Sequence, residues 1–414
     1  MVDSSLYPRF ASQAVRTALT DTPVVVVQGA RQVGKSTLVQ MVASEYNTRM
    51  VTMDDPTTLR MAEDDPKALV DLHPDGLLVI DEAQRAPGVI LPLKANVDAN
   101  RRPGRYLLTG SADLLKVKGV GDSLAGRAET VEMMPLSQGE LARRTSPEDF
   151  ISWLLCGAEG KDFPILDHER VIRGGFPEVV GRASSRRKRW FDSYITRLSG
   201  HDARELRDGG YADQLQAFLT YFAALGQTEL VKTNVARHLG VAESTVDAYV
   251  STAKTMRLIC EYKAWNRAPM RRLVRRPKVC LVDTGLSAAL TSFTASKAVS
   301  PGGWEYYGAL VEQFVALELT KQHQWSNTPY ELYHFRELDG LEVDLIVETH
   351  GADLIAIEVK ATSTPGPKHW ENLTKFRDRF PDRNVTGVLF HTGDFTATLH
   401  GWMHIMPITA LWNH

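Results

Sequence analysis

The sequence predicts a multidomain α/β protein, and three observations support this. The chain has 414 residues, and at roughly 100–200 residues per domain this length predicts two to four domains. Its first part alternates apolar runs, typical of parallel strands buried on both faces, with helical patterns. After a Ser/Thr/Gly-rich stretch at residues 291–303, a long helix and further strands are expected. We therefore expect domains over residues 1–140, 141–290 and 300–414.

The composition is that of an ordinary folded protein. Apolar residues make up 43% of the chain and charged residues 24%, which excludes disordered and fibrous classes. The net charge of −2 leaves no global basic field, so contact with nucleic acid would need local patches. The cysteines Cys156, Cys260 and Cys280 form no CxxC pair, which excludes a cysteine-rich zinc site and favours a reducing compartment. Without an apolar signal core or a run of ~18 apolar residues, we expect a cytoplasmic protein with no membrane span.

The elements of the first region follow one another as strand and helix. A short helix is expected over residues 11–19, and the valine-rich strand at 24–28 comes next. Further strands are expected at 50–53, 77–80 and 106–108, with helical patterns between them. This order predicts a parallel sheet covered by helices.

The segment after the valine-rich strand has the pattern GxxxxGK[ST]. It consists of Gly29, Ala30, Arg31, Gln32, Val33, Gly34, Lys35 and Ser36, and a helix continues from Thr37. The glycines let backbone N–H groups converge on phosphate oxygens, and the helix amino terminus adds partial positive charge. Lys35 is expected to reach the β- and γ-phosphates, and the Ser36 hydroxyl to ligate Mg²⁺. An accidental strand–helix turn is the alternative, but strand, loop and helix all fall where the motif requires them.

Two carboxylates, Asp81 and Glu82, follow the strand expected at 77–80. We expect Asp81 to hold the magnesium shell and Glu82 to orient or deprotonate an attacking water. Favourable acids at a helix amino terminus are the alternative. The next strand ends in small hydroxyl residues, so Thr109 or Ser111 either senses the γ-phosphate or only forms a turn.

These motifs, together with the stretch Ser123-Leu124-Ala125-Gly126-Arg127, resemble the AAA superfamily of P-loop ATPases over about residues 1–140. More narrowly, the chain is similar to a bacterial and archaeal group whose carboxy-terminal half is a domain of unknown function. The resemblance implies that the protein binds ATP and Mg²⁺, with Lys35 and Ser36 as phosphate and metal binders. It makes Asp81 and Glu82 the second ATPase motif and Ser111 a sensor. It makes Arg127 a candidate arginine finger or sensor, acting in cis or in trans within a homo-oligomer. A structural ion pair is the alternative for Arg127.

The middle region has the spacing of a helix-turn-helix. A small residue lies at the expected helix crossing, a glycine in the turn, and apolar anchors on the second helix: Val235-Ala236, Leu239-Gly240-Val241, Val246 and Tyr249. An ordinary helical hairpin is the alternative. On the second helix, Glu243 and Asp247 disfavour contact with DNA, whereas Lys254 and Arg257 favour it.

Two basic clusters are candidates for binding DNA phosphates. The run from Arg267 to Lys278 has basic residues and no acid, and it is expected to form a wing along the backbone. The second cluster is Arg182 with Arg186–Arg189. Protein contact between ATPase subunits is the alternative use of such a winged module.

The last region places carboxylates on two strands, expected at residues 342–347 and 354–359. A turn at His350-Gly351 would make them an antiparallel hairpin that brings Asp344, Glu358 and Lys360 to one face. Two carboxylates and an ammonium are the groups needed to hold Mg²⁺ or Mn²⁺ and to cleave a phosphodiester. Glu312, on the preceding helix, can supply a third carboxylate.

This arrangement is similar to the PD-(D/E)XK nuclease superfamily, whose parts would correspond to Glu312, Asp344, Glu358 and Lys360. The aspartate follows Val343 instead of proline, a departure that leaves the metal argument intact. An exposed hairpin with an ion pair, or a nuclease fold that binds without cutting, are the alternatives. The expected function is an ATP-hydrolysing protein coupled to a DNA-binding, Mg²⁺-dependent nuclease-like domain. A nucleotide-dependent switch or scaffold with an inactive nuclease fold is the other hypothesis.

Overall fold

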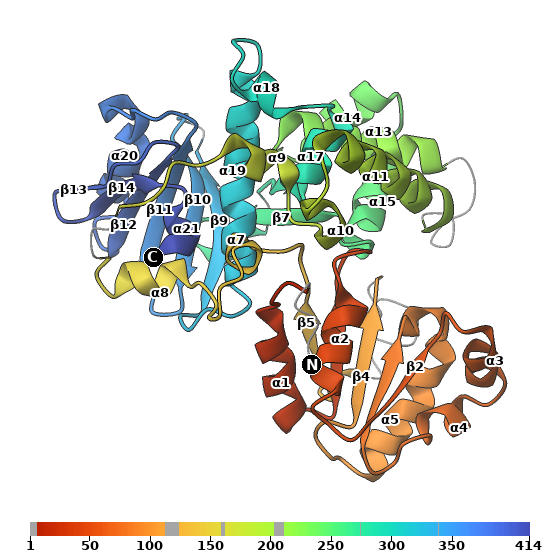
Figure 1. The fold of residues 1–414 in the computed structure, drawn as a ribbon. Coiled ribbons are helices and arrows are strands. Elements are labelled where there is room, and N and C mark those ends of the chain that lie inside the picture. Colours follow the sequence, from red (N-terminus) through yellow and green to blue (C-terminus); the bar gives the residue numbers. More distant parts are fainter. Residues whose placement is uncertain (1–5, 112–123, 159–161, 203–210, 274, 338) are drawn as a thin grey trace. The chain divides into compact units, whose positions relative to one another are not determined.

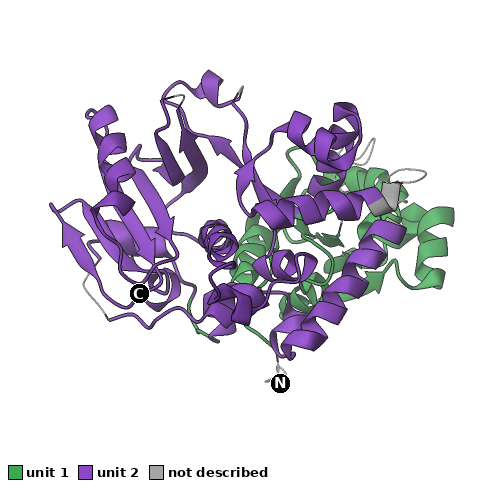
Figure 2. Cartoon of the chain, turned by 90° about the horizontal axis from the view of Figure 1, so that it is seen from above, with its two compact units in different colours: residues 1–136, 143–146, 255–258 green, residues 137–142, 147–254, 259–414 purple. Residues whose placement is uncertain are grey.

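The computed structural model describes residues 6–111, 124–158, 162–202, 211–273, 275–337 and 339–414. The chain divides into two compact units (Figure 2), of which the first comprises residues 1–136, 143–146 and 255–258, and the second the remainder. Within the described part of the chain, no helix combines the length and the apolar character needed to cross a membrane.

The first unit is built on a five-stranded parallel sheet with the order β2-β3-β4-β1-β5. Strands β2, β4 and β5 of this sheet are labelled in Figure 1. The strands are β1 Val24–Gln28, β2 Thr48–Thr52, β3 Leu77–Asp81, β4 Tyr106–Gly110 and β5 Ala128–Glu132. The helices are α1 Ala11–Asp21, α2 Lys35–Ala43, α3 Pro56–Asp64, α4 Pro66–Val70 and α5 Ile90–Ala99, with short 3₁₀ turns η1 Ala83–Arg85 and η2 Pro87–Val89. The four valines of β1 are fully buried, as expected for a central strand covered on both faces. The predicted parallel α/β sheet is confirmed.

Local capping explains where two helices of this unit begin. Asp55 accepts a hydrogen bond from the N–H of Thr58 at 2.8 Å, and Asp65 accepts one from Ala68 at 2.9 Å. Each aspartate is followed by a proline in the first helical position, where the missing N–H costs no hydrogen bond. These caps fix the starts of α3 and α4, which follow β2 in the chain.

The second unit contains a nine-stranded sheet with the order β13-β14-β12-β11-β10-β9-β7-β8-β6. Its strands are β6 Thr228–Glu229, β7 Ile259–Ala264, β8 Lys278–Leu281, β9 Tyr330–Arg336, β10 Glu342–Thr349, β11 Leu354–Lys360, β12 Val385–His391, β13 Ala397–Leu399 and β14 Met403–Pro407. The helices that precede β9 are α7 Gln138–Leu141, α8 Phe150–Leu155, α9 His168–Arg173, α10 Pro177–Val180, α11 Ser184–Arg197, η4 Leu198–Asp202, α13 Tyr211–Leu225, α14 Lys232–Leu239, α15 Glu243–Thr255, α16 Pro269–Arg272, α17 Thr284–Leu290, α18 Ala295–Ala298 and α19 Trp304–Gln322. The last helices are η5 Pro367–His369, α20 Glu371–Arg379 and α21 Ala410–Asn413.

This sheet joins the two regions that the sequence divides near residue 300. Strand β7 pairs in parallel with β9 through Lys263↔Tyr333 and Ala264↔His334. Strands β6 to β8 therefore continue the sheet formed by β9 to β14, and both regions lie in one compact unit. The Ser/Thr/Gly-rich stretch at 291–303 contains the short helix α18 and does not separate two units. Pairing between distant strands was not visible in the local pattern.

The two helices expected in the middle region are α14 and α15. They are joined by a turn at Gly240, whose φ is 67°. Val235, Val246 and Tyr249 are buried, as the spacing predicts. Strands β7 and β8 pair in antiparallel fashion, and β6 pairs with the other edge of β8.

Glu148 is a buried carboxylate that makes the stability of the second unit depend on pH. Its side chain is buried, and this burial, together with the nearby Glu318, raises its pKa from 4.5 to about 7. In the unfolded chain the group ionises from about pH 4.5, so the unfolded state is stabilised relative to the folded state as the pH rises from 4.5 to 7. The contribution of Glu148 to the free energy of unfolding is therefore fully present below pH 4.5 and is lost as the pH rises to about 7.

We expect Glu148→Gln to remove this loss, which amounts to roughly 3 kcal/mol of unfolding free energy. Urea denaturation between pH 5 and pH 8 measures it, with Glu331→Gln at an exposed position as the matched control. An identical pH dependence in the wild type and in Glu148→Gln would contradict the prediction.

Candidate functional site

The loop between β1 and α2 turns back sharply on itself. Gln32 and Gly34 have φ values of 65° and 95°, and α2 begins directly afterwards at Lys35. A Cβ atom at Gly29 would collide with the carbonyl oxygen of Met133, so only glycine fits there. The first N–H groups of a helix have no intrahelical partner. The loop and the start of α2 together therefore form a backbone cradle suited to an anion.

The side chain of Lys35 is folded into this loop. Its Nζ donates to the carbonyl oxygens of Gly29 at 3.1 Å and Ala30 at 3.0 Å. Burial lowers the pKa of Lys35 to about 8, against the attraction of Glu82 and Asp81. A phosphate in the loop would offer the ammonium anionic oxygens in place of the two carbonyls. Of the other expected loop residues, Ala30 and Val33 are buried, whereas Arg31, Ser36 and Thr37 are partly exposed and Gln32 is exposed.

Ser36 and Asp81 meet beside the carboxyl ends of β1 and β3. The Ser36 Oγ lies 3.0 Å and 3.1 Å from the two carboxylate oxygens of Asp81. Thr109, on β4, donates to the same carboxylate through its hydroxyl. Hydroxyl and carboxylate oxygens are the ligands that Mg²⁺ takes. The residues present therefore fit a magnesium ion, which Ser36 and Asp81 would hold.

Glu82 has a backbone conformation that is rare for a residue with a side chain. Its φ of 53° and ψ of 42° place it in the left-handed region. Its N–H donates to Thr109 Oγ1 at 3.0 Å, and its carboxylate accepts from Gln84 and from Ser111 Oγ, the latter at 3.4 Å. Gln84 also donates to Ser111 at 3.1 Å. The polar end of β4 thus holds the backbone of Glu82 and, through Gln84, its side chain.

Two residues of this site carried no signal in the sequence. Arg9 is buried, and its guanidinium donates to the carbonyl oxygens of Val33 and Met134, each at 2.6 Å. It therefore supports the loop from a position 24 residues away in the chain. Gln84 belongs to no motif either, because a single amide after an acidic pair has no characteristic spacing.

Arg127 is not brought to the loop of its own chain. Its carbonyl accepts from the N–H of Val24 at 3.2 Å, so it lies at the amino end of β1, whereas the loop follows the carboxyl end. The guanidinium Nε donates to Asp98 at 2.6 Å, which is the ion pair of the alternative interpretation. A role in the site of a second copy stays a prediction. Ser123 of the same stretch lies outside the described residues.

In the second unit, the structure brings Glu312, Asp344, Glu358 and Lys360 together from α19, β10 and β11. The Lys360 Nζ lies 2.7 Å from Glu358 Oε2 and 3.7 Å from Asp344 Oδ2. Strands β10 and β11 are antiparallel, as expected, and the register of β10 against β9 shifts between Val343 and Ile346. Such a bulge changes the direction of the side chains within it, and Asp344 lies inside it.

Two further residues, Lys278 and Glu342, belong to this carboxylate cluster, and neither was expected there from the sequence. The Lys278 Nζ lies 3.0 Å from Glu312 Oε1 and 3.1 Å from Glu342 Oε1. Burial acts to lower the pKa of Lys278, but the surrounding carboxylates outweigh it and raise the pKa. Burial and the charge of Asp344 raise the pKa of Glu312 to about 7 and that of Glu358 well above its usual value.

The observed arrangement of these side chains does not fit the three-carboxylate metal site that the sequence predicts. In the described ranges, no group of three or more His, Cys, Asp or Glu side chains is placed to hold a metal ion. Glu312 and Glu358 each have an ammonium partner instead. Asp344 also accepts a hydrogen bond from the N–H of Val359 at 2.9 Å.

The basic run from Arg267 to Lys278 is less available than the sequence suggests. Lys278 is buried in the carboxylate cluster, which corrects its expected place on a DNA-facing surface. Arg272 pairs with Glu348 at 2.6 Å, and Arg275 donates to the carbonyl of Arg336 at 2.7 Å. The exposed basic residues of the run are Arg267, Arg271 and Arg276.

The other basic residues expected to contact DNA are also partly buried in ion pairs and partly exposed. Arg187 is buried and pairs with Glu169, whereas Arg186 and Arg189 are exposed. Arg257 lies beyond the end of α15, in the first unit, and its guanidinium binds Glu132 and Gln28. It is therefore not on the second helix of the helix–turn–helix pair, which corrects its expected role.

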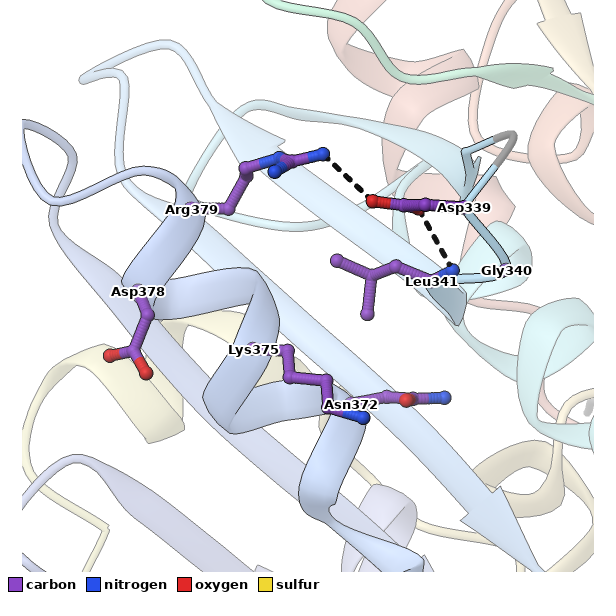
Figure 3. A pocket seen from close by; sticks show the side chains of 7 residues that line it. All are labelled: Asp339, Gly340, Leu341, Asn372, Lys375, Asp378 and Arg379. Atoms are coloured by element: carbon purple, nitrogen blue, oxygen red, sulfur yellow. Dashed lines mark hydrogen bonds and ion pairs between the residues drawn. The ribbon is translucent and has the colours of Figure 1, made fainter.

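A pocket of about 540 Å³ lies beside α20 and the connection between β9 and β10 (Figure 3). Its Arg379 is paired with Asp339 at 3.0 Å and with Glu337. Lys375 is paired with Glu371 at 2.8 Å. The pocket contains none of the expected site residues, so we place no catalytic group there.

Comparison with known proteins agrees with the geometry of the first unit. A family model described as an AAA domain matches residues 21–142. Models of two domains of unknown function, DUF8612 and DUF4143, match residues 167–297 and 307–411. The uncharacterized protein Rv2008c of Mycobacterium tuberculosis is 30% identical over 361 residues, which are 86% of this chain and 74% of the relative. The chain belongs to the family of Rv2008c.

This family includes the uncharacterized protein Mb2031c of Mycobacterium bovis, with the same identity and coverage. The chain carries an AAA-type ATPase domain followed by the two domains of unknown function. Among solved structures, the Walker-type ATPase of Pyrococcus abyssi is 15% identical, with a TM-score of 0.44 over 69% of this chain and 96% of that chain.

Proposed function

We propose that this Rv2008c-family protein binds ATP with Mg²⁺ in the loop over residues 29–37 and hydrolyses it. The observation that supports this most is the contact of Ser36 with Asp81 at 3.0 Å, next to the buried Lys35. Lys35 would transfer its hydrogen bonds from loop carbonyls to phosphate oxygens. Magnesium, when bound, supplies charge neutralisation at the phosphates.

In this proposal Glu82 orients the attacking water and accepts its proton. The left-handed backbone of Glu82 is held by Thr109, and its carboxylate by Gln84 and Ser111. Strained backbone of this kind persists only where the surroundings fix it. Ser111, as the sensor, would pass a change at the γ-phosphate to Glu82 through this contact.

We further propose that ATP hydrolysis is coupled to a DNA-binding, nuclease-like domain formed by the second unit. In this proposal α14 and α15 with β6–β8 act as a winged helix, and exposed arginines at 186, 189, 271 and 276 supply positive charge. In the second candidate function, ATP switches a module that binds DNA or protein without cutting, in a monomer or homo-oligomer. The ion pairs of Lys278 and Lys360 with the cluster carboxylates favour the second candidate.

A cleavage assay on the purified protein separates the two functions. Supercoiled plasmid is incubated with Mg²⁺ or Mn²⁺, with and without ATP, and compared with Glu358→Ala and with the exposed control Glu331→Ala. Nicking that Glu358→Ala removes and Glu331→Ala retains would establish the nuclease. If the wild type binds plasmid without nicking it, the switch is the correct function.

A further inference from the structure

Lys278 is far more buried than Lys360, the other lysine of the carboxylate cluster. Its side chain is 5% exposed, whereas that of Lys360 is 33% exposed. Lys278 begins β8 and is paired on one side with Tyr262 of β7 and on the other with Glu229 of β6. The Lys278 ammonium is therefore enclosed beside Glu312, whereas the Lys360 side chain reaches solvent.

The position of the Lys278 ammonium is one that a cation must fill. Glu312 Oε1 and Glu342 Oε1 both lie within 3.1 Å of it, and Glu312 comes from a helix while Glu342 comes from a strand. Carboxylates brought this close repel each other unless a positive charge lies between them, and burial strengthens the repulsion. An ammonium and a divalent ion cannot occupy the same place.

We propose that Lys278 is an internal cation of the carboxylate cluster and excludes a divalent metal ion from Glu312 and Glu342. This inference deepens the proposed nuclease-like function and takes the location of the site from it. It accounts for the absence, in the part of the chain that is described, of three carboxylates arranged around a metal position. Asp344 and Glu358, paired with the more exposed Lys360, then remain as a two-carboxylate site that binds divalent ions weakly.

The test is direct titration of nucleotide-free protein with Mn²⁺, followed by electron paramagnetic resonance. Lys278→Met removes the charge at nearly constant length and should bind Mn²⁺ on the order of tenfold or more tightly than the wild type. Lys278→Arg keeps the cation and should behave as the wild type. Adding Glu312→Gln to Lys278→Met should abolish the gain, which places the new ion at the cluster and not in the loop over residues 29–37.

Thermal unfolding supplies a second measurement, because Lys278→Met removes the positive charge that lies between Glu312 and Glu342. Mn²⁺ should raise the unfolding temperature of Lys278→Met and leave that of the wild type unchanged. If Lys278→Met does not fold, Lys278→Gln, whose amide can still donate to Glu312, takes its place in both measurements. Equal Mn²⁺ affinity in the wild type and the neutral variant, or a gain that survives Glu312→Gln, would overturn the inference.

The same proteins separate this inference from the proposed function. If the neutral variant gains Mn²⁺ but binds no DNA and cuts none, the internal cation stands and the nuclease-like function falls. The opposite outcome is that the wild type cuts DNA and that the neutral variant binds Mn²⁺ no more tightly than the wild type. This result would support the nuclease function and contradict the proposed role of Lys278 as an internal cation.

Discussion

Lys35→Ala is expected to lose ATP binding, with an affinity lower by roughly 10²-fold or more. Its ammonium is the buried positive charge of the loop and lies against the carbonyls of Gly29 and Ala30. Removing one partner of a buried, hydrogen-bonded charge pair costs roughly 2–5 kcal/mol, and about 1.4 kcal/mol is tenfold in affinity. Isothermal titration calorimetry with ATP and Mg²⁺ measures the effect.

The matched control is Lys67→Ala, an exposed lysine on α4 of the same unit. It removes the same charge from the chain without touching the loop, and its affinity for ATP should equal that of the wild type. Circular dichroism confirms that both variants fold. Wild-type affinity in folded Lys35→Ala would remove the loop from the ATP site and with it the proposed function.

Glu82→Gln is expected to keep ATP binding and to lose turnover by about 10²–10⁴-fold, the range of a general base. The amide retains the size of the side chain and its contact with Gln84, but it cannot accept the proton of an attacking water. Phosphate release under single-turnover conditions gives the rate, and calorimetry gives the affinity. Binding and turnover thus separate at Glu82, whereas both fail at Lys35.

Glu63→Gln, an exposed position on α3, serves as the control for this variant. It should hydrolyse ATP at the rate of the wild type. If Glu82→Gln also does so, Glu82 does not orient the water. The left-handed backbone conformation at Glu82 would then contribute only to positioning the neighbouring Asp81.

The elements around the nucleotide loop could be predicted because their signals are local. The run of valines, the GxxxxGKS pattern and the apolar strand ending at Asp81 each occupy a few consecutive residues. Strand, loop and helix follow from such a run without knowledge of the rest of the chain. The bounds of β1 agree with the expected residues 24–28, and α2 begins at Lys35, two residues before the expected Thr37.

Contacts between distant segments could not be predicted in this way. The support of Val33 by Arg9 depends on how the amino-terminal segment packs under the loop. The place of Arg127 depends on the direction of β5, whose pairing with β1 sets it at the edge away from the loop. The spacing of residues in a single sequence shows neither the contact of Arg9 with the loop nor the position of Arg127 away from it.

The sequence by itself determined the phosphate loop, the acidic pair, the helix–turn–helix spacing and the hairpin that carries Asp344 and Glu358. Only the tertiary structure decided what the lysine at 278 does. In the sequence it ends a basic run, but β8 buries it against Glu312, which lies 34 residues further along the chain. The physical reason is that a run of basic residues is recognised from residues adjacent in the chain. The partner of a buried charge depends instead on which strands pair, because a buried charge without a partner costs free energy.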